Sequence, residues 1–171
     1  MAYSTVPKVR RDGTITLKDG TTPTAIALAV AYEEGNLTFE ISKADQTVIR
    51  DRSIITTVRK GDEQPAATGS FSAFMREFAD QTNAGSIVDF INKTNNYSGN
   101  VATTGSGAVY VEEYCIDIEY DVEGTNFGDD LDHKATLKQC ICTVSFTEGD
   151  PSTFAISFTC YGGVELDGPG T

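Results

Sequence analysis

The sequence contains no tryptophan and a single histidine, His133. A Ser/His/Asp triad would have to use that histidine, yet no nucleophile-elbow sequence occurs in the chain. No Cys-x-x-Cys is present, so a zinc site has little support. The Gly-x-Gly at 105–107 lies in a loop without a βαβ context and does not make a phosphate-binding motif. We therefore expect neither an enzyme nor a cofactor or metal site.

Long apolar runs are also missing. No run approaches the roughly 20 residues that span a bilayer, and no apolar signal segment follows the polar residues 1–5. We expect synthesis in the cytoplasm and no membrane insertion. In that reduced compartment the four cysteines are interpreted as buried free thiols: Cys115, Cys140, Cys142 and Cys160.

Basic residues are scarce relative to acidic ones. The chain has 13 Lys and Arg against 25 Asp and Glu, a net charge of −12. The imbalance is local, because residues 1–60 hold 9 bases and 7 acids whereas residues 112–171 hold 2 bases and 13 acids. A surface this acidic repels nucleic acid, since phosphate binding requires Lys and Arg to displace counterions. Whether the acidic segment 129–133 binds Ca²⁺ stays open, because it lacks the spacing of an EF-hand loop.

Alternation of apolar and polar residues dominates the chain and is typical of half-buried strands. Strand-like runs cover 13–18, 24–32, 36–42, 46–59, 109–122, 136–147 and 153–161. Asp19-Gly20 closes the first run with a hairpin signal. In the last run Phe154, Ile156 and Phe158 are expected to face inward.

Two helices are expected between the strands. Phe71, Phe74, Met75 and Phe78 fall at i, i+3, i+4 and i+7, which predicts a main helix over about 71–82. Ser86 to Asp89 form a capping box that opens a short second helix over about 87–92.

Strands, then helices, then strands predict a mostly-β (α+β) fold, a β-sandwich or barrel with a helix packed on it. We expect one domain over residues 1–171. It would carry a long loop or hairpin over about 43–65 and a loose C-terminal tail over 163–171.

One face of the predicted strand 109–122 is acidic. Alternation places four carboxylates on it: Glu113, Asp117, Glu119 and Asp121. Like charges on one strand face repel each other, so this face is expected as an exposed ladder beside water. It would line any channel that an oligomer encloses, with Glu40 as a secondary candidate. DNA could slide through such a channel without binding to its walls.

At this point the sequence resembles the major tail tube proteins of long-tailed (siphovirus-type) bacteriophages. Residues 10–20 are similar to the opening hairpin of such subunits, and residues 32–39 to the strand that follows. Residues 59–65 with 69–75 resemble the family's loop into a strand edge and helix, and residues 154–162 its closing strand. The resemblance covers most of residues 10–162 and depends on the order of these features.

The resemblance implies a structural role. Six copies would form a ring whose inner wall is a continuous β-barrel, and rings would stack into a hollow tube with an acidic lumen that conducts viral DNA. The implied partners are the chain itself and the tail tip, tail terminator and tape measure proteins, in the virion tail after assembly in the host cytoplasm.

A long loop between early strands of these proteins reaches a neighbouring ring. The matching segment here, roughly 43–65, holds five bases: Lys43, Arg50, Arg52, Arg59 and Lys60. We expect this basic loop to pair with the acidic C-terminal half of another copy.

Three alternatives stay open. A phage-tail-like bacteriocin or a secretion-system tube would share the ring physics without the virus. A β-sandwich adhesion or carbohydrate-binding module would use Tyr97, Tyr110 and Tyr161 as a platform, although it would lack tryptophan. An enzyme would depend on His133.

Overall fold

The structure, a computed structural model, describes residues 13–30, 36–61, 65–75, 86–104, 109–122 and 133–167. These residues are mostly β, which confirms the predicted fold class. The strands are β1 (Gly13–Lys18), β2 (Ala27–Val30), β3 (Thr38–Glu40), β4 (Gln46–Asp51), β5 (Ile54–Lys60), β6 (Ala67–Phe74), β7 (Ile116–Val122), β8 (His133–Thr147), β9 (Thr153–Cys160) and β10 (Val164–Asp167). The helical segments are α1 (Ile87–Asn92) and the 3-10 helix η2 (Asn95–Tyr97).

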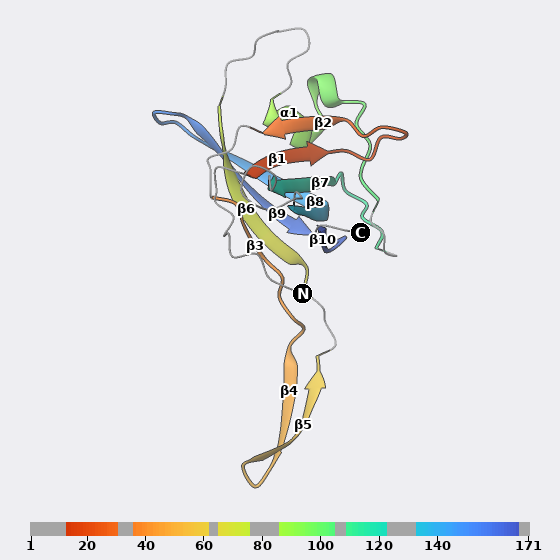
Figure 1. Cartoon of the computed structure of the whole chain (residues 1–171), viewed down its shortest axis with the longest axis vertical. Helices are drawn as coiled ribbons and strands as arrows, with labels where there is room; N and C mark the ends of the chain where they lie inside the picture. Colours follow the sequence, from red (N-terminus) through yellow and green to blue (C-terminus); the bar gives the residue numbers. More distant parts are fainter. Residues whose placement is uncertain are drawn as a thin grey trace.

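One antiparallel sheet of eight strands forms the body (Figure 1). Its order is β2-β1-β7-β8-β9-β6-β3, and β10 pairs with β8. The long strand β8 belongs to two parts of this sheet. Its first half pairs with β7 and β10, whereas from Cys140 onward it pairs with β9. We call the first part, with β1 and β2, the β7 half-sheet, and the second part, with β6 and β3, the β9 half-sheet.

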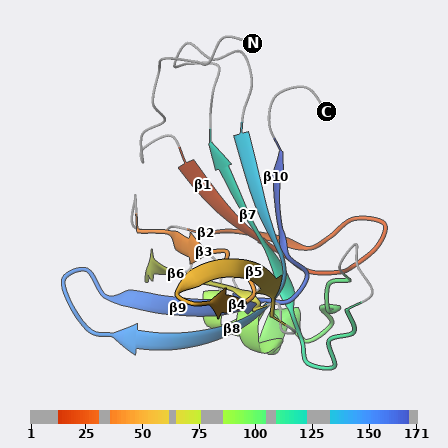
Figure 2. The ribbon, with the colours of Figure 1, turned by 90° about the horizontal axis from the view of Figure 1, so that it is seen from below.

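The two half-sheets turn away from each other at a bulge in β8. The register between β7 and β8 shifts between Ile116 and Ile118. The residue opposite this shift, Gln139, has a φ of 51°. Figure 2 shows β1, β7 and β10 running across the direction of β9. A bulge in a shared strand is how crossed sheets make a corner.

A single apolar core lies between the half-sheets. The β7 half-sheet contributes Ile15, Leu17 and Ile118, and the β9 half-sheet contributes Ile156 and Phe158 to the same cluster. Burial of each such side chain stabilises the fold by about 1.5–3 kcal/mol. The predicted inward residues of the last strand therefore pack as expected, with Phe154 partly buried against this core.

The short helix α1 confirms the helix predicted over about 87–92. Ser86 accepts a hydrogen bond from the Asp89 backbone N–H at 3.0 Å, and Asp89 accepts one from the Ser86 backbone N–H at 3.2 Å. Both bonds satisfy N–H groups that a helix start leaves without partners. The helix then buries Phe90 and Ile91, so its apolar side closes one end of the core.

The main helix predicted over about 71–82 is wrong in its first part. Residues Ala67–Phe74 form the strand β6, which pairs with β9 from Ala67 opposite Cys160 to Phe74 opposite Thr153. Phe71 and Ala73 are buried, while Phe74 lies on the opposite face. Pairing along the whole strand outweighs the local helical spacing of the aromatic residues. Residues 76–85 lie outside the described part of the chain.

Gly69 shows why this segment is a strand. A Cβ atom at this position would collide with the Phe158 ring and with the Thr38 carbonyl oxygen. Both neighbours belong to strands that flank β6. A glycine weakens a helix, but here it gives the large ring across the strand room to reach the core.

Two further boundaries are corrected. The tail predicted as loose over 163–171 contains β10, whose Val164 lies opposite Leu137 of β8 and packs against the core; residues 168–171 lie outside the described part. The strand predicted over 109–122 begins only at Ile116. Residues 109–115 precede the strand because β8 bends away beyond Cys140 and offers them no partner edge.

Asp19 organises the connection between β1 and β2, which runs over residues 19–26 instead of forming a tight turn. Its side chain is 3% exposed. One carboxylate oxygen accepts hydrogen bonds from the Ile26 and Thr21 backbone N–H groups at 2.6 and 3.2 Å. The other accepts from the Val101 N–H at 3.1 Å and from the Thr21 hydroxyl. Desolvation raises the pKa of Asp19, but these hydrogen bonds outweigh it and leave the pKa lowered.

Replacing Asp19 by alanine is expected to reduce the free energy of unfolding at pH 7 by about 3 kcal/mol, because several donors lose a charged acceptor. The folded-state pKa is lowered, so the stabilisation is present above the unfolded pKa of about 3.9 and is lost as pH falls through the folded value. Urea unfolding at neutral and acidic pH measures both effects. Asp51→Ala, at an exposed position, serves as the control; an equal loss in both variants would contradict the assignment.

Candidate assembly surfaces

The strands β4 and β5 form a two-stranded hairpin that projects away from the body (Figure 1). The turn between them has Arg52 at φ 48° and Ser53 at φ 69°. Two central residues with positive φ define a type I′ turn, whose twist matches that of the flanking strands. Near this turn, β5 has a bulge at Thr56, which lies opposite the junction of Ile49 and Arg50 in β4. The segment expected as a long loop or hairpin over 43–65 thus contains a regular arm.

Every residue of β4 and β5 is exposed. Branched apolar side chains occur throughout the arm, with exposed fractions of 40% to 70%: Val48, Ile49, Ile54, Ile55 and Val58. The register of the two strands places Val48, Ile55 and Val58 on one face of the arm and Ile49 and Ile54 on the other. An isolated two-stranded hairpin is only marginally stable in water. The arm therefore carries apolar surface on both faces that the described part of the chain does not cover.

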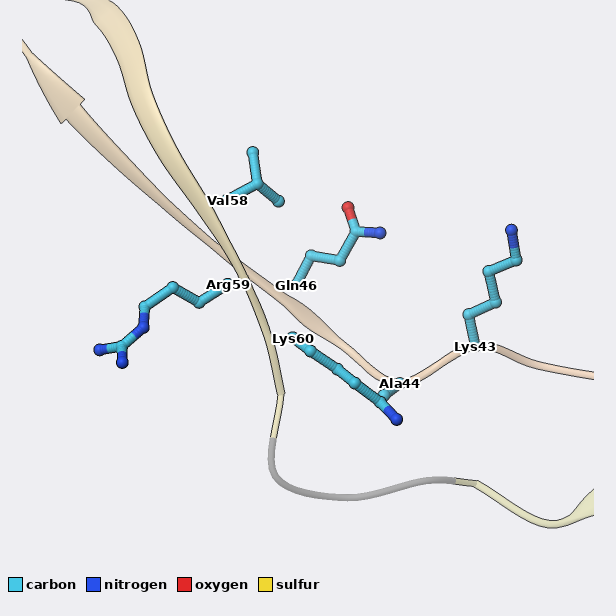
Figure 3. A pocket seen from close by; sticks show the side chains of 6 residues that line it. All are labelled: Lys43, Ala44, Gln46, Val58, Arg59 and Lys60. Carbon is cyan, nitrogen blue, oxygen red and sulfur yellow. The ribbon is translucent and has the colours of Figure 1, made fainter.

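The five predicted basic residues lie along this arm. Lys43 precedes β4, Arg50 lies opposite the bulge, Arg52 occupies the turn, and Arg59 and Lys60 end β5. At the base of the arm three of them line a cleft of about 400 Å³ together with Ala44, Gln46 and Val58. Figure 3 shows the Lys43 and Arg59 side chains extending to opposite sides of it, with Lys60 between them. The base of the arm is thus a basic concavity.

The predicted acidic residues fall on three different parts of the molecule. Asp117, Glu119 and Asp121 lie on the face of β7 that points away from the core. Glu113 lies in the segment before β7 and is exposed. Glu40 ends β3, at the edge of the β9 half-sheet. The structure therefore keeps three of the five together.

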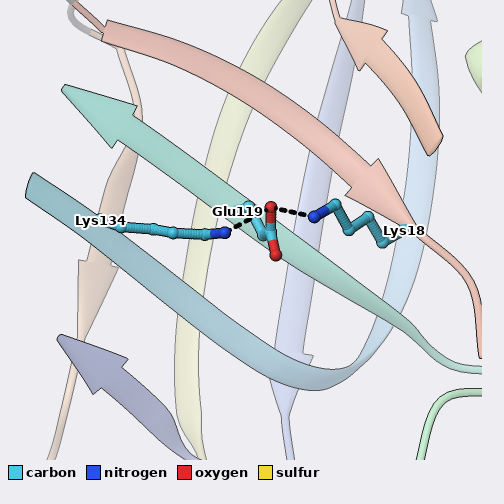
Figure 4. A network of polar contacts seen from close by, with 3 residues as sticks. All are labelled: Lys18, Glu119 and Lys134. Atoms are coloured by element: carbon cyan, nitrogen blue, oxygen red, sulfur yellow. Dashed lines mark ion pairs between the residues drawn. The ribbon is translucent and has the colours of Figure 1, made fainter. Parts of the chain in front are cut away.

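The row on β7 is not the bare acidic ladder that alternation predicts, because lysines from both neighbouring strands reach it. The Glu119 carboxylate forms ion pairs with Lys18 of β1 and Lys134 of β8, whose Nζ atoms lie 2.6 and 2.9 Å from its Oε2 atom (Figure 4). Its side chain is 16% exposed. Desolvation raises the pKa of Glu119, but the two lysines outweigh it and leave the pKa lowered. Glu119 is thus a charge held inside a network.

Asp117 is also engaged. It accepts a hydrogen bond from the Gln139 backbone N–H at 2.9 Å. Burial nevertheless raises the pKa of Asp117, against the lowering effects of that bond and of Lys138. Lys138 itself forms an ion pair with Glu165 of β10 at 2.7 Å. The outer face of the β7 half-sheet is therefore a mixed and partly neutralised surface.

Gln139, Lys18, Lys134 and Lys138 were not predicted as site residues. Their roles depend on strand register, which single-strand alternation does not contain. The sequence offered one indication that a base lies near the acidic row: Lys18 ends an alternating run, and alternation places its side chain on the outer face.

The other candidates are dispersed. Tyr110 is 87% and Tyr161 45% exposed, whereas Tyr97 packs edge-on against Phe90 at 4.9 Å between ring centroids. Cys115, Cys140 and Cys160 are buried free thiols and Cys142 is half-buried. Burial raises the pKa of Cys140, and it raises that of Cys142 to about 12.

Within the described ranges, no cluster of His, Cys, Asp and Glu side chains is suited to hold a metal ion. Residues 129–132 of the acidic segment lie outside those ranges. In the same part of the chain, no helix has the length and apolarity that a bilayer crossing requires.

Comparisons with known proteins give a likeness of fold. No protein-family model and no curated protein sequence matches the chain. A solved structure that matches is a chain in the cryo-EM structure of the anti-feeding prophage (AFP) baseplate, 6-fold symmetrised. The two chains share 8% sequence identity with a TM-score of 0.52, and the match covers 98% of each. At this identity the match establishes a shared fold along the whole chain.

Glu119→Gln is expected to reduce the free energy of unfolding by about 1 kcal/mol, because two lysines lose their shared counterion while solvent still screens part of the network. The loss should shrink at high salt, which screens charge interactions. Urea unfolding at low and high salt measures it. Asp121→Asn on the same strand is the matched control; a salt-independent loss, or an equal loss in both variants, would contradict the network.

Proposed function

We propose that this chain is a non-enzymatic structural subunit of a phage-tail-type assembly and that it works by packing against copies of itself. The observation that carries the proposal is the projecting β4–β5 arm. Its exposed branched side chains, such as Ile54 at 70% and Ile55 at 52%, form apolar surface on both faces. Exposed apolar surface of this kind marks an interaction site. The fold likeness to a chain of the AFP baseplate supports a tail-type assembly as the setting.

In the proposed arrangement six copies form a ring, and rings stack into a hollow tube that conducts viral DNA. A closed ring requires heterologous contacts, in which different surfaces of successive copies meet. The arm reaches from one ring toward the next. The same proposal places the protein in the virion tail, with the tail tip, tail terminator and tape measure proteins as further partners. DNA passes through the bore without specific binding.

A related injection machine, such as a phage-tail-like bacteriocin or a secretion-system tube, is the second candidate. The observation that favours it is the matching structure itself, which is a prophage baseplate. In both candidates the subunits would form rings that stack into a tube. Electron micrographs of particles from the producing cell distinguish them, because only a phage carries DNA-filled capsids on its tails.

Charge complementarity indicates which surface of another copy the arm contacts. The arm and its base carry Lys43, Arg50, Arg52, Arg59 and Lys60, whereas residues 112–171 hold 13 acids and 2 bases. Complementary potentials orient encounters and suppress wrong partners. We propose that the basic arm of one copy contacts the acidic C-terminal half of another, while the branched apolar side chains supply the buried contact.

Arg50→Glu with Arg52→Glu is expected to weaken polymerisation, because it reverses the charge at the end of the arm while leaving the core unchanged. Negative-stain electron microscopy and sedimentation of concentrated protein measure the loss of rings and tubes. Arg50→Lys with Arg52→Lys keeps the charge and should assemble normally.

Unchanged tubes in the glutamate variant would contradict the proposed electrostatic role of the arm. A wild-type protein that stays monomeric at high concentration would remove the proposed function as a whole.

A further inference from the structure

Small hydroxyl side chains make up most of the outer face of the β9 half-sheet, which also holds Ile141 and Phe74 toward its two ends. Across its four strands the register places Thr143 opposite Ser157, Ser157 opposite Ser70, and Ser70 opposite Thr38. A neighbouring row joins Ser145, Ala155 and Ser72. The side chains of the longest row are all exposed. We call this surface the hydroxyl face; its two central rows are flat, because their side chains are short and follow the pleat in register.

Charge is almost absent from the hydroxyl face. Among the described strand residues that alternate onto it, Glu40 is the one charged side chain, and it stands at the β3 edge. The outer face of the β7 half-sheet differs, since it carries several carboxylates, of which Glu119 and Glu165 form ion pairs with Lys18, Lys134 and Lys138. The molecule therefore presents one lysine-bridged sheet face and one hydroxyl face whose single charge, among the described strand residues, is that of Glu40 at the β3 edge.

Both ends of the β9 half-sheet are open strand edges in the described structure. The strand β3 ends the sheet order and pairs with β6 alone. At the other end, β7 accompanies β8 only as far as Cys140, so the rest of β8 has β9 on one side and no described strand on the other. Such edges carry unpaired backbone N–H and C=O groups that can accept a further strand.

The two edges match each other in direction and in side-chain pattern. Neighbouring strands alternate in direction from β8 through β9 and β6 to β3. In copies related by rotation, β3 of one copy would therefore run antiparallel to β8 of the next. Each edge also presents an apolar side chain that is 55% exposed: Ile41 directly after β3 and Phe146 on β8. By strand alternation both lie on the core-directed face, opposite the hydroxyl face.

From these observations, and resting on the proposed function, we infer that the β3 edge of one copy pairs with the edge of β8 beyond Cys140 in the next copy. At this joint Thr38 lies opposite Thr143, so Phe39 of one copy and Cys142 of the next meet on the core-directed side. On the other side it extends the row of Thr143, Ser157, Ser70 and Thr38 into the following copy. Repetition closes the hydroxyl faces into the inner wall of the ring, so the bore is lined by hydroxyl groups, with the carboxylate of Glu40 at each joint.

Disulfide cross-linking tests the pairing. In a Cys142→Ser background, Thr38→Cys is combined with Thr143→Cys or, one register step further, with Ser145→Cys. Cysteines on adjacent antiparallel strands lie close enough to be bridged. Diamide takes up the two electrons and two protons released as each S–S bond forms. Assembled protein should then run as a ladder of covalent oligomers on a denaturing gel. Thr38→Cys with Ser157→Cys, on the same face but on an interior strand, is the control.

The outcomes separate the inference from the proposed function. A ladder from at least one edge pair and none from the control supports the inference. Rings or tubes without a ladder from either edge pair, or with an equal ladder from the control, overturn the inference and leave the proposed function standing. Protein that never assembles overturns both.

Maleimide accessibility tests which face lines the bore. In assembled protein, Ser157→Cys should react with a small maleimide and not with a polymer-linked maleimide, whereas Thr14→Cys on the outer face of β1 should react with both. Both variants should react with both reagents as monomers. Shielding of Thr14→Cys alone would assign the bore to the acidic row of β7 and overturn the inference. Shielding of both sites, or of neither, would overturn it as well.

Discussion

The bulge at Gln139 is the constraint on which both surfaces of this molecule depend. Its φ of 51° turns β8 from the β7 half-sheet into the β9 half-sheet. The contacts around it hold that turn: its backbone N–H donates to Asp117 at 2.9 Å, and its carbonyl accepts from the Tyr161 N–H at 3.2 Å. Because one strand serves both half-sheets, a single core suffices for the two layers. The outer faces are then free to differ, one bridged by lysines and the other lined with hydroxyls.

In the proposed assembly, the arm would gain most of its stability from contacts with another copy. Its residues have high strand propensity, and its type I′ turn has a twist that matches the two strands, so the hairpin forms from local interactions. It has no layer to pack on within the described chain, and the branched side chains stay in water. Five basic residues on and beside it limit unwanted association, since charged side chains near exposed strands hinder edge-to-edge aggregation. The same bases favour an acidic partner, which gives association a preferred direction.

Local patterns predicted the parts of this fold that depend on local interactions. The capping box at Ser86 and the alternation in β1 and β9 depend only on residues close together in the chain. These elements appear where they were expected. The aromatic stripe from Phe71 failed because cross-strand pairing with β9 decides that segment. The alternation from Ala67 to Ala73, with small polar residues between buried ones, carried the correct signal. The lysine bridges to Glu119 were beyond sequence reasoning, since they depend on the register of β7 with β8 and with β1, which lies about 100 residues earlier in the chain.

The contrast between the two outer faces also bears on how a polyanion passes through a tube. A wall of carboxylates repels phosphate, but crowding like charges around a ring costs repulsion within the wall itself. Hydroxyl groups avoid that cost, because they offer weak hydrogen bonds that water exchanges readily and contribute no counterion release to retain the polymer. A bore with one carboxylate per joint would combine low adhesion with low self-repulsion. On this view the acidic surplus of the C-terminal half acts between subunits, where bases of the arm can neutralise it, and the channel depends mainly on the absence of charge.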